Sequence, residues 1–209
     1  MVTHHSILVS GGIPVARSWW PIAQDNCGGL TFMSFTIWLT GLPGSGKTTI
    51  ATALGDFLHQ NELTYEILDG DILRKTLCSD LGYSPEDRQK NAIRVAYVCQ
   101  ILNKNKIISV VSLITPYNQS RKKVKSIVPN LVEVYVFCPI EVLIKRDPKG
   151  LYKKALEGEI KDFTGISAPY EIPESPDVIV QTDRMSVHEC VKYIIDAATD
   201  KGFLGKIFP

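Results

Sequence analysis

From residue 35 onward, the sequence alternates short apolar runs with segments of helical periodicity. Apolar runs that predict β-strands are Phe35–Thr40, Tyr65–Leu68, Ile107–Ile114, Leu131–Phe137 and Val178–Val180. Segments with the 3.6-residue period of an α-helix lie near 47–60, 85–104, 118–128, 139–146 and 186–199. Strands that alternate with helices form parallel βαβ units, in which helices cover both faces of the sheet. We therefore expect one α/β domain with three layers, α/β/α, around a mainly parallel five-stranded sheet.

The segment near 85–104 carries an apolar stripe and a polar pair. Ala92, Val95, Ala96, Cys99 and Leu102 recur at helical spacing, which predicts a face packed in the core. Arg88 and Asn91 are i, i+3 neighbours, and we expect them on the opposite face. Such a pair usually lies on a solvent-exposed polar face of a helix.

The two ends of the chain differ from this alternating region. Residues 1–33 carry only Arg17 and Asp25 as charged side chains and show neither helical nor strand periodicity. Because a secretory signal usually begins with basic residues and the first residues contain no lysine or arginine, we expect no such signal here. We expect a poorly ordered extension over 1–33, or translation that begins at Met33, followed by the domain over 34–203 and a tail over 204–209.

Composition narrows the possible partners. Hydrophobic residues make up 44% and charged residues 22% of the chain, as in soluble globular proteins. The net charge is +1, so no overall basic field attracts nucleic acid or an anionic membrane. No apolar run approaches the roughly 18 residues of a membrane helix. The five cysteines form no CxxC pair, which favours reduced thiols in the cytoplasm over disulfides or a zinc site.

One motif identifies a phosphate-binding loop. The pattern G-x-x-x-x-G-K-[ST] is matched in full by Gly41, Leu42, Pro43, Gly44, Ser45, Gly46, Lys47 and Thr48. Glycines let backbone N–H groups curl around a phosphate, Lys47 reaches the β- and γ-phosphates, and Thr48 offers a hydroxyl to Mg²⁺. An apolar strand enters the loop and an amphipathic helix leaves it, with its positive end toward the anion. The sequence therefore predicts a site for a nucleoside triphosphate with Mg²⁺.

The loop alone leaves open the class of nucleotide-dependent protein. A GTPase needs an Asn-Lys-x-Asp motif after a late strand, and Asn103–Lys106 lacks the aspartate and precedes its strand. A mechanical ATPase needs a longer chain. The small size favours a small-molecule kinase.

Charged and hydroxyl residues follow the second and third predicted strands. Asp69 and Asp71 flank Gly70, and Arg74 lies one turn farther along. The carboxyl ends of parallel strands face the ligand crevice, so one carboxylate can accept a hydroxyl proton while the other binds substrate or a magnesium water. Alternatively, Asp71 caps the helix that contains Arg74. Thr115, just before Pro116, is a turn residue on this evidence.

Taken together, these residues resemble the adenylylsulfate kinase family, whose members phosphorylate adenosine 5′-phosphosulfate at its ribose 3′-hydroxyl. The resemblance covers about 37–195. It rests on the phosphate loop through Thr49, on Asp69–Arg74, and on the run Leu81–Asn91. Its most specific part is the set Arg146–Lys153, Phe163–Ile166 and Pro169–Pro173.

The resemblance implies a P-loop kinase fold with a helical lid over about 147–170, which excludes water when it closes. It implies that Asp69 is the base or orients the hydroxyl, with Lys47, Lys149 and Thr115 also in the catalytic set. It places ATP on residues 41–49 and Arg146, and Mg²⁺ on Thr48. The substrate-binding residues that it implies are Asp71, Arg74, Tyr83, Arg88, Asn91, Ile114, Thr115, Lys149 and Phe163. Tyr83 and Phe163 would sandwich the substrate adenine.

The chain departs from the family pattern at three positions. Thr115 replaces a serine that some descriptions make a phosphorylated intermediate, and we expect direct in-line transfer with only substrate contact there. Asn118 replaces an arginine, although Arg121 keeps the second arginine of the region, so anion affinity is expected to be lower. Tyr83 replaces phenylalanine and still offers an aromatic face.

The resemblance also suggests partners, and two other functions compete with it. A homodimer is expected, with association with ATP sulfurylase as a further option.

One competing function is that of a kinase of another small hydroxyl compound, which would not need two stacking rings. The other is a nucleotide-binding regulator or scaffold, for example a partner subunit of a sulfurylase.

Overall fold

The computed structural model describes residues 33–205, and within them five strands form one parallel sheet in the order β2-β3-β1-β4-β5. The strands are β1 (Thr36–Thr40), β2 (Tyr65–Asp69), β3 (Ile108–Ser112), β4 (Leu131–Phe137) and β5 (Val178–Gln181). The helices are α1 (Lys47–Gln60), α2 (Gly70–Leu73), α3 (Pro85–Lys104), α4 (Asn118–Ile127), α5 (Ile140–Arg146), α6 (Leu151–Leu156) and α7 (Val187–Asp200). The expected three-layer α/β/α fold is confirmed.

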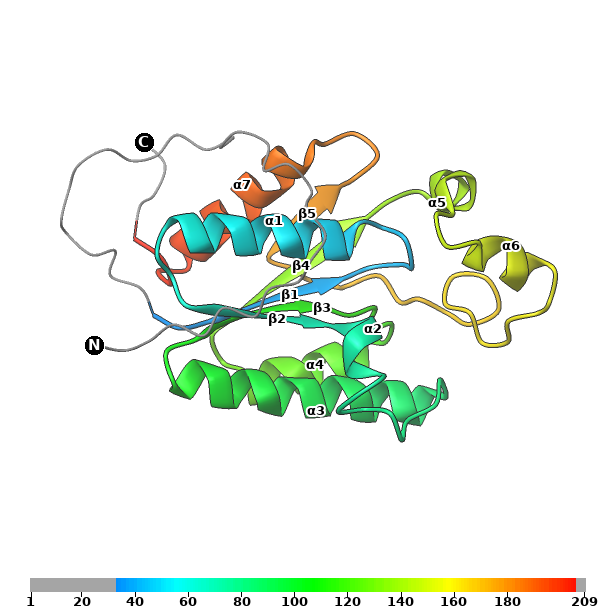
Figure 1. Cartoon of the computed structure of the whole chain (residues 1–209), viewed down its shortest axis with the longest axis horizontal. Helices are drawn as coiled ribbons and strands as arrows, with labels where there is room; N and C mark the ends of the chain where they lie inside the picture. Colours follow the sequence, from blue (N-terminus) through cyan, green and yellow to red (C-terminus); the bar gives the residue numbers. More distant parts are fainter. Residues whose placement is uncertain (1–32, 206–209) are drawn as a thin grey trace, which may run out of the picture.

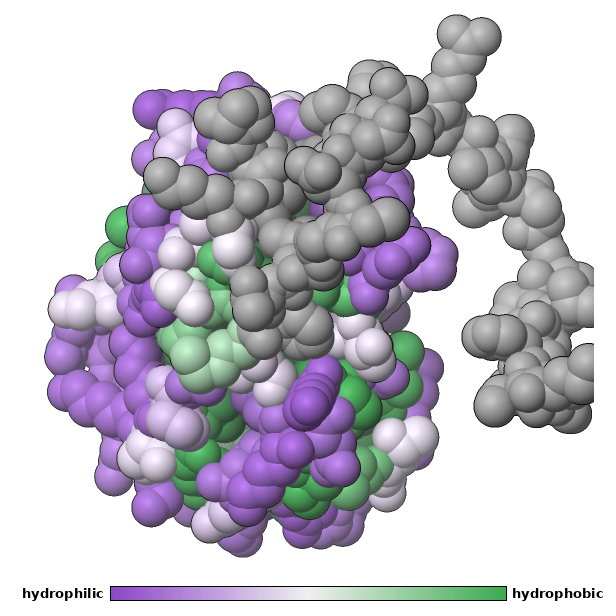
Figure 2. Space-filling model, turned by 90° about the vertical axis from the view of Figure 1, so that its left-hand side faces the viewer, coloured by the Kyte–Doolittle hydropathy of each residue, from purple (hydrophilic) through white to green (hydrophobic). Residues whose placement is uncertain are grey.

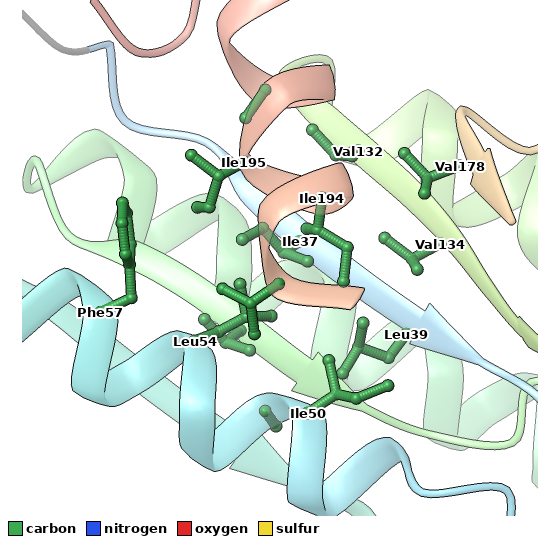
Figure 3. Close-up of a cluster of buried hydrophobic side chains, with 14 of the residues drawn as sticks. Ile37, Leu39, Ile50, Leu54, Phe57, Val132, Val134, Val178, Ile194 and Ile195 are labelled. Atoms are coloured by element: carbon green, nitrogen blue, oxygen red, sulfur yellow. The ribbon is translucent and has the colours of Figure 1, made fainter. Parts of the chain in front are cut away.

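Two apolar clusters hold the layers together. Helices α1 and α7 cover one face of the sheet, and α3 and α4 cover the other (Figure 1). On the first face, Ile37 of β1 and Val134 of β4 pack against Leu54 of α1 and Ile194 of α7 (Figure 3). Burial on both faces explains why β1, β3 and β4 are buried along nearly their whole length, whereas the edge strands β2 and β5 expose Glu66 and Ile179.

Helices α5 and α6 extend beyond the carboxyl ends of the strands (Figure 1). The segment over about 147–170, which is expected to act as a lid, includes α6 and is called the lid below. A third apolar cluster, built around Leu143, Tyr152 and Phe163, forms the core of the lid together with Ile140 of α5 and Leu42 of the phosphate loop. The opposite end of the molecule, at the amino ends of the strands, shows hydrophilic residues around smaller hydrophobic areas (Figure 2).

Several expectations concern the ends and the surroundings of the chain. The predicted extension lies outside the described residues except for Met33, whose N–H donates to the Phe203 carbonyl. Most of the predicted tail also lies outside them.

Within 33–205, no helix has the length and apolar character needed to cross a membrane. The cysteines of this part, Cys78, Cys99, Cys138 and Cys190, are buried free thiols.

Candidate active site

A cavity of about 490 Å³ lies at the carboxyl ends of the strands, between the body and the lid. Its walls include most of the residues singled out in the sequence: Pro43, Gly44, Gly46, Lys47, Thr48, Thr49, Asp69, Asp71, Arg74, Tyr83, Arg88, Asn91, Ile114, Thr115, Lys149 and Phe163. Gly41, Leu42, Ser45 and Arg146 are not among the described residues that line it. Ser112, which the sequence analysis did not single out, also lines the cavity.

The phosphate loop is shaped by its glycines and holds its lysine inward. Gly41 has φ +157°, and a Cβ there would lie 2.4 Å from the Val136 carbonyl oxygen, so no other residue fits. Lys47 Nζ donates to the carbonyls of Gly41 (2.9 Å) and Leu42 (2.8 Å). Burial lowers the pKa of Lys47 to about 7, although Asp71 and Asp69 oppose this shift. A bound anion would restore the charged form.

Three side-chain oxygens meet beside the loop. Thr48 Oγ1 donates to Asp69 Oδ2 at 3.0 Å and lies 3.4 Å from Ser112 Oγ. They come from the start of α1 and the ends of β2 and β3, which are brought together by parallel pairing. A carboxylate and two hydroxyls form an all-oxygen set, the chemistry that Mg²⁺ prefers, so these residues fit the ion that the motif implies.

Asp69 also has a structural role. Its Oδ1 accepts a hydrogen bond of 2.9 Å from the Asp71 backbone N–H, so Asp69 is the N-cap of α2. The alternative in which Asp71 caps this helix is therefore wrong, because the helix begins two residues earlier than that alternative requires. The exposed Asp71 side chain instead forms a 2.6 Å ion pair with Lys149 of the lid. This hydrogen bond raises the pKa of Lys149.

Two arginines surround Tyr83. The guanidinium carbon of Arg74 lies 4.4 Å from the centre of the Tyr83 ring, and that of Arg88 lies 5.5 Å from it. Arg88 Nε donates to the Tyr83 carbonyl at 2.8 Å, and its Nη2 donates to the Asp162 carbonyl of the lid at 2.7 Å. Burial lowers the pKa of Arg88. This arginine thus links one wall of the cavity to the lid.

The predicted solvated face of α3 is wrong, since Arg88 is 8% exposed and Asn91 is 5% exposed. Positions 88, 92, 95 and 99 follow helical spacing, so the polar pair continues the buried stripe where the stripe passes beyond the sheet and meets the cavity. Asn91 Oδ1 is buried without a hydrogen-bond partner, as is Thr164 Oγ1 on the lid. Unsatisfied buried polar atoms on a cavity wall are expected where a ligand supplies the partner.

The two predicted stacking rings line the same cavity but differ in exposure. Tyr83 is 59% exposed, whereas Phe163 is 9% exposed and packs edge-on against Tyr152 at 5.1 Å. Tyr152 in turn donates to the Pro43 carbonyl of the phosphate loop at 2.8 Å. Phe163 therefore belongs both to the cavity wall and to the core of the lid.

Thr115 occupies a strained backbone position, with φ +41°. Its hydroxyl accepts a 3.0 Å hydrogen bond from the Trp38 indole N–H, and its carbonyl accepts one of 2.6 Å from Arg121. β3 has already ended at Ser112, before the predicted end of the apolar run at Ile114. Arg121 donates to protein carbonyls and is not among the described residues that line the cavity.

Arg146 lies behind the phosphate loop. Its Nη2 donates to the Thr182 carbonyl at 2.9 Å, and the Thr182 hydroxyl donates to the Ser45 carbonyl at 3.0 Å. Thr182 was missed in the sequence, where a threonine after the last strand carries no signal of its own.

The fold and this loop define a P-loop kinase. The family model described as adenylylsulphate kinase matches residues 33–181, and the chain belongs to this family. An adenylyl-sulfate kinase of Chloroflexus aurantiacus is 47% identical over 167 residues, which cover 80% of this chain and 90% of the relative. One of Clostridium kluyveri is 49% identical over 162 residues, 77% and 81% of the two chains.

Solved structures agree with this assignment. The structure of the APS kinase CysC of Mycobacterium tuberculosis, in complex with AMPPNP and APS, is 36% identical to this chain with a TM-score of 0.78. The match covers 81% of this chain and 99% of that one.

Proposed function

We propose that this protein is an adenylylsulfate kinase, which transfers the γ-phosphoryl group of ATP to the ribose 3′-hydroxyl of adenosine 5′-phosphosulfate. The products are 3′-phosphoadenylylsulfate and ADP. The observation that carries this proposal is that residues of the phosphate loop and Asp69 line the same cavity as Tyr83, Asn91 and Phe163. Family membership and the similar relatives support the same substrate.

Asp69 is the residue that we propose to accept the proton of the 3′-hydroxyl. Its Oδ2 faces the Thr48 hydroxyl while Oδ1 is held by the cap of α2, so the carboxylate has a fixed orientation. Lys47 would exchange its carbonyl partners for the β- and γ-phosphates and neutralise charge as the bond to the leaving oxygen breaks. Thr115, with its hydroxyl held by Trp38, would contact substrate without forming a phosphoryl intermediate.

Mg²⁺ is proposed to be held by Thr48, with Asp69 and Ser112 beside it. When bound, it would neutralise negative charge on the phosphates of ATP. The protein contributes the fixed hydroxyl and carboxylate positions.

Substrate recognition is proposed to use the opposite wall. Asn91 Oδ1 needs a donor, which an amino group of the adenine could supply. Tyr83 and Phe163 would stack on the base, and Ile114 would add apolar contact. Arg74 and Arg88, with Asp71 nearby, would bind the phosphosulfate end, since guanidinium groups pair well with such anions.

The lid would complete the site. Lys149 is exposed and paired with Asp71, so an incoming anion can take this lysine over at small cost. Arg146 would act on the ATP side, next to Thr182 behind the loop. Closure excludes water, which would otherwise accept the phosphoryl group.

We further propose a cytoplasmic homodimer, with association with ATP sulfurylase as an option. Reduced buried thiols and the use of ATP support the cytoplasm. Light scattering of the purified protein, alone and with a sulfurylase, tests the two assemblies.

The test of the function is conversion of adenylylsulfate by purified protein with ATP and Mg²⁺, followed as ADP release and product mass. A product heavier by one phosphoryl group, formed only with adenylylsulfate, supports the proposal. Turnover with another hydroxyl compound instead would identify a different small-molecule kinase. A thermal shift with ATP but no turnover with any acceptor would favour the regulator or scaffold.

A further inference from the structure

Arg121 of α4 connects two segments that are far apart in the sequence. Its Nη1 donates to the Thr115 carbonyl at 2.6 Å, on the substrate side of the cavity. Its Nη2 donates to the Glu171 carbonyl at 2.5 Å, where the chain returns from the lid to the body. The side chain is 4% exposed. One buried guanidinium therefore bridges the substrate wall and the end of the lid.

The first of these segments needs external support. Thr115 has φ +41°, and a β-branched residue is disfavoured there, so the surroundings must hold it. Trp38 holds its hydroxyl, and Thr40 Oγ1 donates to the Ile114 carbonyl at 2.6 Å. The hydrogen bond from Arg121 is the one that holds the Thr115 carbonyl most closely.

The second segment is fixed to the same place from several directions. The Glu171 N–H donates to the Pro116 carbonyl at 2.8 Å, and the Asn118 N–H donates to Glu171 Oε2 at 2.6 Å. The Tyr170 hydroxyl lies 3.0 Å from Thr40 Oγ1. The return of the lid is thus joined to the loop after β3, and Arg121 lies at the centre of this joint.

The lid is also attached at other places, since Arg88 Nη2 donates to the Asp162 carbonyl at 2.7 Å and the Tyr152 hydroxyl donates to the Pro43 carbonyl at 2.8 Å. The Lys149–Asp71 pair is 66% and 72% exposed, so water and salt weaken it. Lys149 and Phe163 of the lid both line the cavity. The joint at Glu171 ties the carboxyl end of the lid to the loop after β3, which also lines the cavity.

We propose that Arg121 is a positioning residue, which sets the backbone of Thr115 and the return of the lid together so that both close on adenylylsulfate in one arrangement. This inference rests on the proposed function. Arg121 acts through Thr115 and Glu171 and does not touch the reacting atoms.

A simpler role for Arg121 would be to balance a buried charge. Its Nε lies 3.5 Å from Glu133 Oε1, and Glu133 is 4% exposed. Lys125, which is 41% exposed, pairs with the other oxygen of the same carboxylate at 2.6 Å but contacts neither Thr115 nor Glu171. Lys125→Gln is therefore a matched control for charge balance.

The decisive variant is Arg121→Lys in the full chain. It keeps a positive charge near Glu133, but an ammonium group cannot reproduce the planar fork toward two carbonyls. We expect the KM for adenylylsulfate to rise about tenfold or more, because small misplacements of positioning groups are costly. The Kd for ATP should stay within about twofold of wild type, since the phosphate loop is not part of the joint. A larger share of ADP should form without 3′-phosphoadenylylsulfate, because the lid excludes water less well and water accepts the phosphoryl group.

Hydrogen exchange gives a second measure that does not depend on turnover. Amides over 163–171 should exchange faster in Arg121→Lys than in wild type, while amides of α1 should not change. Lys125→Gln should match wild type in KM, in ADP formed without product and in exchange. Equal changes in both variants, or none in Arg121→Lys, would overturn the proposal.

If Arg121→Lys does not fold, Tyr170→Phe and Glu171→Ala decide the matter, because they loosen the same joint without removing the partner of Glu133. A raised KM with unchanged ATP affinity supports the proposal, and wild-type kinetics in both rejects it. Failure of wild type to phosphorylate adenylylsulfate, by contrast, overturns the proposed function, and exchange over 163–171 still reports on the joint.

Discussion

The hydroxyl of Thr48 donates a 3.0 Å hydrogen bond to Oδ2 of Asp69, and this contact joins the phosphate loop to the end of β2. The second oxygen of the same carboxylate caps α2. Asp69 is therefore held from two sides, by the first turn of α1 and by the backbone of α2. An experiment on its chemistry has to separate the carboxylate charge from the helix cap.

Asp69→Asn makes this separation. An asparagine oxygen can still accept from the Asp71 N–H, so we expect an unchanged melting temperature and normal ATP binding. Without a group that accepts the hydroxyl proton, kcat should fall by about 100-fold or more. Asp69→Ala is the companion variant, which should lose the same activity and about 1 kcal/mol of stability with the cap. Near-normal turnover in Asp69→Asn would remove Asp69 from the proton transfer.

Magnesium dependence tests the role of Thr48. Thr48→Val keeps the shape but removes the hydroxyl, whereas Thr48→Ser keeps it. We expect the Mg²⁺ concentration for half-maximal activity to rise about 10- to 100-fold in the valine variant and little in the serine variant. Titration of Mg²⁺ at fixed ATP measures this, and a chelator should abolish wild-type turnover. Superimposable titration curves for all three proteins would contradict the assignment.

The lowered pKa of Lys47 predicts proton uptake with ATP. The folded protein without ligand releases the Lys47 proton near pH 7, whereas the ordinary pKa is 10.5. Between these values the unfolded chain binds more protons, so this group makes stability rise as the pH rises. A bound triphosphate raises the pKa again, so ATP binding at pH 8 should take up about one proton.

Calorimetry of ATP binding in two buffers of different ionisation enthalpy measures this proton uptake. At pH 6 Lys47 is already protonated, and its share of the uptake should disappear. Equal apparent enthalpies in both buffers at pH 8 would show that Lys47 is charged before ATP binds.

Long patterns with clear ends were predictable from the sequence. The segment 85–104 matches α3 because Ser84 caps it, with its hydroxyl accepting from the Asp87 N–H at 3.1 Å, and Pro85 occupies the first turn. The start of α1 at Lys47 was predictable because the phosphate-loop motif ends at this position, directly after Gly46, which is the N-cap of the helix. By contrast, α2 and α6 have only four and six residues, too few for periodicity to reveal.

The candidate site was predictable where a motif fixes local geometry and unpredictable where side chains meet across the fold. The phosphate loop has a characteristic sequence motif, so its residues were predicted from the sequence. Trp38 could only be assigned to the core, yet its indole N–H holds Thr115 from another strand. Arg88 and Asn91 were misplaced because polar residues were assumed to face water, whereas a cavity can lie beyond the end of a sheet.

Phe163 provides the sharpest test of substrate recognition. Truncation to alanine would also remove its edge-on contact with Tyr152, so Phe163→Leu is the better variant, because it keeps apolar bulk in the lid and removes the flat ring. We expect the KM for adenylylsulfate to rise roughly tenfold or more, since a base stacked on an aromatic ring is worth about 1–3 kcal/mol. The Kd for ATP should not change.

Ile166→Val is the matched control for this test. Ile166 packs in the same apolar cluster of the lid but is not among the described residues that line the cavity. It should keep the wild-type KM, whereas Tyr83→Leu should raise it as Phe163→Leu does. If Phe163→Leu binds adenylylsulfate as tightly as wild type, the ring is part of the lid core alone and does not stack on the substrate.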